Sequence, residues 1–233
     1  FFCLILLVGF VIRIIPAHNN NFYFTMDQGD DAVRARDIWF RHKIPLIGQG
    51  TSMQGLYHGP FWSWFLSIGY YLFGGHPFAA LFMLIILNLS VSGLLMLRLK
   101  EYFSPRLALL IGFNLQFFWP FYEASRYAFS PIPLVSIAIL TILLLTEAKW
   151  KPWKFIVTAV TVGMIIHTEL ASFAPLFVLC LFIGIKGFIN KYWPAKNIFY
   201  FLILLAVFFI PHILTEIPSN FPQSGALVRN LRS

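Results

Sequence analysis

Long apolar runs, separated by short polar connectors, constrain this chain more than any other feature of its sequence. A helix that crosses a bilayer needs about 20 apolar residues, with about 17 as a practical minimum. Only 11% of the residues are charged, against about 25% in soluble domains. The sequence therefore predicts an all-α, polytopic membrane protein. The apolar runs lie at about 1–15, 61–73, 77–97, 107–121, 132–146, 155–167, 171–185 and 198–214.

Basic connectors between the later runs predict the topology. Each is separated from the next by two runs, so all of them lie on one side of the membrane, which the positive-inside rule makes cytoplasmic. These connectors also explain the net charge of +8, so that charge does not indicate nucleic-acid binding. Their residues are Arg98, Lys100 and Arg106, then Lys149, Lys151 and Lys154, then Lys186, Lys191 and Lys196.

The short aromatic run at 61–73 determines where the first long polar loop, residues 16–76, lies. If the run crossed the membrane, this loop would share the cytoplasmic side with the basic connectors. Its Trp and Tyr residues instead favour the membrane interface. We therefore predict about seven spans, with 61–73 as a juxtamembrane helix and the loop on the outer side. We expect residues 1–233 to form a single transmembrane domain that is a fragment of a longer chain.

A second juxtamembrane helix is predicted within this loop, at about 30–43. Asp30–Arg34 and Asp37–Arg41 are spaced as i, i+4 ion pairs in the favourable order. The apolar residues Ala35, Ile38 and Trp39 share one side of the helix, which makes it amphipathic. The loop is therefore expected to lie on the membrane surface.

Asp27 and Asp30 are the candidate catalytic residues. A helix N-cap followed three residues later by an acid would explain both structurally, because the helix dipole favours negative charge there. One cap does not require Asp27, Asp30 and Asp31 together, however. A carboxylate at a cavity beside the membrane is suited to act as a general base toward an incoming hydroxyl or amine.

Other polar residues are candidates for substrate binding. Arginine is suited to holding phosphate oxygens. His58 could face a phosphate or cap the turn before the aromatic run. Ionisable residues beside a membrane span, such as His167, are functional candidates by default, although a lone histidine is as often a hydrogen-bonded structural group. Glu123 is expected to form an i, i+3 ion pair with Arg126. The substrate-binding candidates are Arg34, Arg36, His58, Arg126, His167 and Glu169.

Several motifs together resemble those of the membrane glycosyltransferases of the GT-C superfamily, specifically glycosyltransferase family 39. In that family an outer-loop Asp-Glu pair precedes an Ala-Arg-rich juxtamembrane helix and a Lys/His-Pro-Pro-Leu turn. Two positions depart from the pattern, because Gln28 replaces Glu and Gly59 replaces the first Pro. The matching segments are Asp27-Gln28, Ala35-Arg36-Asp37-Ile38, His58-Gly59-Pro60-Phe61 and Phe73-Gly74.

The resemblance implies an inverting enzyme that moves a sugar from a polyprenyl-phosphate donor to an unidentified acceptor on the outer side of a bacterial or archaeal cytoplasmic membrane. Asp27 would be the base, and Arg34 or Arg36, His58 and Arg126 would stabilise the leaving phosphate. Aligning Asp30 with the family aspartate loses the match at residues 35–38, so Asp30 is the contender.

This reading requires no cofactor, and the sequence shows no metal-binding pattern. The expected partners are membrane lipid and the lipid-linked sugar, without nucleic acid. Two alternatives remain. One is a membrane transporter or flippase, although the matching halves with broken helices that such proteins contain are absent from the sequence. The other is a non-catalytic polyprenyl-lipid-binding protein.

Overall fold

The computed structural model describes residues 1–129, 131–145, 152–168, 178, 181–182, 184–185, 189, 195–218 and 220–232. Within these residues the regular elements are helices, with one isolated antiparallel bridge between Gly50 and Tyr57. The predicted all-α class is therefore confirmed. In chain order the elements are α1 (Phe2–Ile14), the 3₁₀ helix η1 (Ile15–Asn20), α2 (Met26–Phe40), α3 (Phe61–Leu72), α4 (Phe78–Tyr102), α5 (Pro105–Phe117), α6 (Trp119–Glu123), α7 (Leu134–Leu145), α8 (Pro152–Thr168), α10 (Ala195–Glu216) and α11 (Pro222–Arg232).

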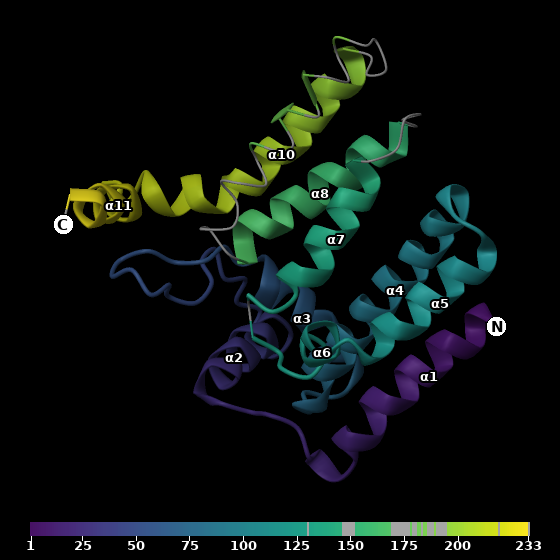
Figure 1. The fold of residues 1–233 in the computed structure, drawn as a ribbon. Helices are drawn as coiled ribbons and strands as arrows, with labels where there is room; N and C mark the ends of the chain where they lie inside the picture. The colour runs from purple at the N-terminus through teal and green to yellow at the C-terminus, as the bar shows by residue number, and fades with distance from the viewer. Residues whose placement is uncertain are drawn as a thin grey trace.

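The helices form two neighbouring groups. α1, α4 and α5 pack against one another, α8 packs against both α7 and α10, and contacts between α4 and α7 join the groups (Figure 1). The short helices α2, α3 and α6 gather at one end of these long helices (Figure 1). α2 packs on α3, which in turn contacts α4 and α8. The polar first loop is therefore held at one end of the bundle by both groups.

Two helices in the described part of the chain are long and apolar enough to cross a membrane, α4 with 25 residues and α10 with 22. Shorter apolar helices lie at Phe2–Ala17, Leu134–Leu144 and Trp153–Thr168. The number of about seven spans stays a prediction, and the run at 171–185 lies largely outside the described residues. α3 has 12 residues, which at 1.5 Å per residue is about 18 Å. That length is short of the hydrocarbon core of about 30 Å.

Helix α2 begins four residues earlier than predicted because Thr25 is its N-cap. The side chain of Gln28 accepts a hydrogen bond from the Thr25 backbone N–H at 2.8 Å, which is half of a capping box. The interpretation of Asp27 as the N-cap is therefore wrong, and Asp27 lies in the first turn of the helix. α2 ends at Phe40, earlier than predicted, because His42 has a left-handed backbone with φ of 53°.

Alanines on α2 allow it to lie close against α3. Ala32 and Ala35 are buried in a core cluster with Leu66 of α3. At the end of this interface, the indole N–H of Trp39 donates to the Ser67 carbonyl at 2.8 Å. Small residues bring the two backbones together, so the start of α2 is held on a rigid support.

Candidate active site

The two candidate bases differ in their partners. Asp30 accepts from the Arg34 Nε at 2.9 Å, and a second ion pair joins Arg41 Nε to Asp37 at 3.4 Å. Both predicted i, i+4 pairs are thus confirmed. The Asp27 side chain is exposed and forms no hydrogen bond or ion pair within the described residues. Asp27 therefore presents an uncommitted carboxylate at the start of α2, whereas Asp30 is engaged by Arg34.

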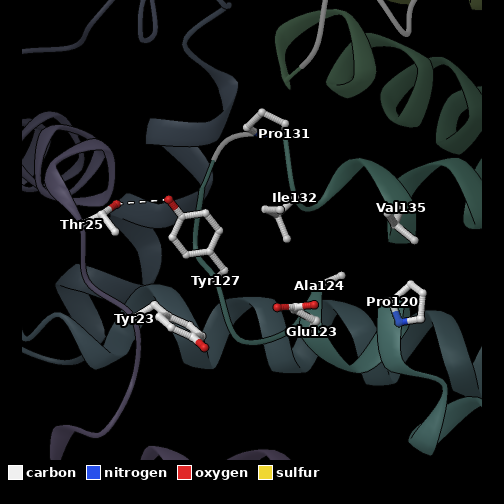
Figure 2. Close-up of a pocket in the computed structure, with 9 residues that line it drawn as sticks. All are labelled: Tyr23, Thr25, Pro120, Glu123, Ala124, Tyr127, Pro131, Ile132 and Val135. Carbon is white, nitrogen blue, oxygen red and sulfur yellow. Dashed lines mark hydrogen bonds between the residues drawn. The ribbon is translucent and has the colours of Figure 1, made fainter.

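A cavity of about 570 Å³ lies beside the start of α2 (Figure 2). It is open to the outside and is bordered by the segment that leads into α2, by α6, and by the segment that leads into α7 with its first turn. Its walls are mainly apolar, with the Thr25 hydroxyl, two tyrosines and the Glu123 carboxylate as polar groups. The Tyr127 hydroxyl lies 3.2 Å from the Thr25 hydroxyl. The lining residues are Tyr23, Thr25, Pro120, Glu123, Ala124, Tyr127, Pro131, Ile132 and Val135.

Arg126 precedes Tyr127 of the cavity wall but does not itself line the cavity, and it does not form the ion pair predicted for it. Its guanidinium lies 5.6 Å from the ring centroid of Tyr122 and 6.0 Å from that of Tyr23. Helix α6 ends at Glu123, and the Arg126 N–H then donates to the Glu123 carbonyl at 2.8 Å in a turn. An i, i+3 spacing brings two side chains together on a helix, but here the helix ends at Glu123 and Arg126 lies in the turn after it. Glu123 consequently faces the cavity (Figure 2).

The loop at 48–60 connects the start of α2 with the other helix group. Gly48 N–H donates to the His58 carbonyl, and His58 N–H donates to the Gln49 carbonyl, each at 2.8 Å. The Gln49 side chain in turn donates to the Asp27 carbonyl. His58 itself is buried, with 6% of its surface exposed. Gln49 therefore couples the backbone of the candidate base to the turn that carries His58.

His167, at the end of α8, is fully buried and has both ring nitrogens engaged. Its Nδ1 accepts from Phe61 N–H at 3.3 Å, and its Nε2 lies 2.7 Å from the Phe208 carbonyl. Its own carbonyl accepts from Gly59 N–H at 3.0 Å. These bonds require the neutral tautomer with the proton on Nε2. Substrate binding by His167 stays a prediction, but this geometry makes the residue a link between three segments of the chain.

The predicted site residues are thus brought together only in part. Asp27 and Arg126 lie at the α2 side, and His58 and His167 lie at the α8 side, with Gln49 between them. Arg36 lies over the Phe40 ring at 5.6 Å and beside Gly75, at the other end of α3. Glu169 lies outside the described residues. Among the residues that the structure describes, no group of three or more metal-ligating side chains is present.

Asp31 is a buried carboxylate that the sequence analysis did not single out. Its side chain is 1% exposed, between α2 and α3, and its Oδ2 has no hydrogen-bond partner among the residues that the structure describes. Burial raises the pKa of Asp31 to about 7. The indole of Trp62 lies near enough to oppose this rise, although its N–H lies outside hydrogen-bond geometry. Asp31 lies one turn before Ala35, so the predicted apolar face already contained it.

Solved structures with a similar fold define the class to which this arrangement belongs. Two crystal structures of ArnT from Cupriavidus metallidurans, one bound to undecaprenyl phosphate and one in the apo state, match with a TM-score of 0.68 each. The sequence identities are 16% and 17%, and each match covers 95% of this chain and 42% of the ArnT chain. The chain therefore has a GT-C fold and spans less than half of the length of these relatives.

The sequence match identifies the family. Residues 57–214, more than half of the chain, match the family model of dolichyl-phosphate-mannose-protein mannosyltransferase. The chain belongs to this family, which confirms the resemblance drawn from its motifs. No curated protein sequence matches the chain significantly.

Proposed function

We propose that the chain is the membrane part of an inverting glycosyltransferase that moves a sugar from a polyprenyl-phosphate donor to an acceptor on the outer side of a membrane. The observation that carries this proposal is the uncommitted Asp27 carboxylate two residues after Thr25, which lines a cavity of about 570 Å³. Membership of the mannosyltransferase family supports sugar transfer. The shared fold with a protein crystallised with undecaprenyl phosphate supports a lipid-phosphate donor.

In the proposed reaction, Asp27 accepts the proton of an acceptor hydroxyl or amine. The acceptor oxygen or nitrogen then bonds to the anomeric carbon, and the bond from that carbon to the phosphate oxygen breaks. The electron pair leaves with the polyprenyl phosphate. Arg126, the neighbour of the cavity-lining Tyr127, is suited to stabilise the negative charge on this phosphate, because oriented cations act where charge develops.

Exposed apolar surface supports the membrane location. Only 11% of the apolar stretch of α10 is buried, against 56% for α4. A core helix of a soluble protein would be mostly buried, so α10 requires an apolar environment. The basic connectors favour an orientation with the first loop on the outer side, in a bacterial or archaeal cytoplasmic membrane.

A pair of matched substitutions tests the assignment of the base. The full-length protein in liposomes would be incubated with a radiolabelled polyprenyl-phosphate sugar, and transfer or hydrolysis would be measured for Asp27→Asn and Asp30→Asn. We expect Asp27→Asn to lower the rate by about 10²- to 10⁴-fold, the usual contribution of a general base. Asp30→Asn should retain activity within about tenfold, since it loses only an exposed ion pair.

The opposite ranking would assign the base to Asp30, and unchanged activity in both variants would refute a catalytic role for this helix. If the wild-type protein binds the labelled lipid without breaking the sugar–phosphate bond, the non-catalytic lipid-binding alternative replaces the proposal. Movement of the intact lipid between leaflets would indicate a flippase.

A further inference from the structure

A fully buried arginine lies behind the wall of the cavity. Arg13, in the last turn of α1, is 0% exposed. Its Nε donates to the Ser125 hydroxyl at 2.9 Å, and its Nη1 donates to the Gly9 carbonyl at 2.9 Å and to Gln116 Oε1 at 3.2 Å. The Tyr122 ring centroid lies 5.5 Å from the guanidinium carbon. One side chain therefore joins α1, α5 and the turn after α6.

The surrounding helices are arranged around this network. Gln116 also donates to the Ser92 hydroxyl of α4 at 2.5 Å and to the Gly112 carbonyl at 3.0 Å. Gly9 leaves the space that Gln116 fills, since a methyl group at Gly9 would overlap the Gln116 amide. The buried network thus extends from α1 through α5 to α4.

Arg13 has no carboxylate partner within the described residues, and its Nη2 forms no hydrogen bond. A buried cation without a counter-charge is costly, and hydrogen bonds only partly offset that cost. An apolar side chain would join the same helices at lower cost. The unfavourable free energy of burying this charge therefore favours a function for the arginine beyond helix packing, as is general for ionisable residues beside or within a membrane.

The turn that Arg13 holds is the one that forms the cavity. Ser125 separates Glu123 and Arg126, and its hydroxyl donates to the Tyr122 carbonyl at 2.5 Å while it accepts from Arg13. The Tyr122 hydroxyl donates to the Ile12 carbonyl at 3.4 Å. The turn is thus attached to α1 at two points, one on each side of Glu123.

We propose that Arg13 is a positioning residue that acts through Ser125, fixing the turn at 122–127 that carries the cavity-lining Glu123 and Tyr127 together with Arg126. This inference rests on the proposed function, because it assigns Arg13 an effect on turnover of the lipid-linked sugar. Arg13 does not contact the substrate. It determines where the residues of the cavity wall lie.

The test uses the full-length protein and compares Arg13→Met, Arg13→Lys and Ser125→Ala with wild type. kcat/KM for the polyprenyl-phosphate sugar would be measured per folded protein, with the folded fraction taken from the monodisperse peak in size-exclusion chromatography. We expect Arg13→Met to lower kcat/KM by about ten- to a hundredfold, from the loss of hydrogen bonds to a charged group. Arg13→Lys should not restore activity, because one ammonium lacks the fork that reaches Ser125 and Gln116 together.

A double-mutant cycle separates positioning from general stability. Arg126→Ala lowers kcat/KM by some factor in the wild-type background. That factor should be at least three times smaller in the Ser125→Ala background, because the turn is already displaced there. The control is Thr141→Val, which removes a buried hydrogen bond to Ile137 within α7, and it should leave kcat/KM within about twofold of wild type. The inference would be overturned if the effects of Arg126→Ala and Ser125→Ala on kcat/KM were independent of each other. It would also be overturned if folded Arg13→Met had the wild-type kcat/KM.

Binding provides the second readout. The affinity for undecaprenyl phosphate, measured by native mass spectrometry, should fall at least threefold in Ser125→Ala. A wild-type protein without transferase activity would refute the proposed function, and an unchanged affinity in Ser125→Ala would then refute the positioning role separately. If Arg13→Met does not fold, the Ser125→Ala cycle decides, since that substitution removes a single hydroxyl.

Discussion

Replacing Asp31 by asparagine should stabilise the protein at neutral and alkaline pH. The ordinary pKa of an aspartate is 3.8, and burial raises the pKa of Asp31 to about 7. Between these values the unfolded chain is ionised at Asp31 whereas the folded protein keeps the proton, so wild-type stability falls as the pH rises. At about 1.36 kcal/mol per pH unit, the full difference corresponds to about 4 kcal/mol. Asparagine remains neutral and removes this pH dependence.

The assay is thermal unfolding of the purified protein in detergent, for wild type and Asp31→Asn, from pH 4.5 to pH 8.5. The Asn variant should have nearly the wild-type Tm at the acidic end and a higher Tm above pH 7. With about 2–4 °C per kcal/mol for a chain of this size, the gain is on the order of 10 °C. Asp37→Asn, on the same helix but paired with Arg41 at the surface, is the control. A Tm difference that does not change with pH would refute the reasoning.

Two further substitutions test the contacts around the candidate site. Gly59→Ala should destabilise the protein by about 1–3 kcal/mol in urea or thermal unfolding, because the added methyl group would overlap the His167 ring. Gly29→Ala should instead stabilise it by up to about 1 kcal/mol, because Gly29 lies in α2 and its methyl group would meet only Phe24 at 4.0 Å. Gln28→Ala should cost about 1 kcal/mol through loss of the capping bond to Thr25, and Gln28→Glu, which keeps an acceptor oxygen, should recover most of it in the same measurement.

Local features of the fold could be predicted from the sequence because they depend on neighbours a few residues apart. The helix at 61–73 and the ion pairs Asp30–Arg34 and Asp37–Arg41 are of this kind. The start of α2 differs from the predicted start at about residue 30, which was placed from the amphipathic pattern and the i, i+4 ion pairs alone. The capping hydrogen bond between Thr25 and Gln28, which are three residues apart, begins the helix at Met26 instead.

The arrangement of the candidate site depends on tertiary contacts that no local pattern contains. The ring of His167 accepts a bond from Phe61, 106 residues away in sequence, and Arg13 donates to Ser125, 112 residues away. The expected Glu123–Arg126 ion pair is not formed for a related reason, since α6 ends at Glu123 and Arg126 lies in the turn that follows. Partners within one helix turn were therefore predictable, whereas partners distant in sequence were not.

The bonds made by His167 set an order for biogenesis. Its backbone carbonyl bonds the loop at 48–60 through Gly59, and its ring connects Phe61 to the Phe208 carbonyl of α10, a helix that is synthesised much later. Domains generally fold as units while synthesis proceeds from the N-terminus. The first loop therefore cannot reach its final conformation until α10 has been made and inserted, so nascent chains that stop before α10 should expose this loop to proteases for longer than complete chains do.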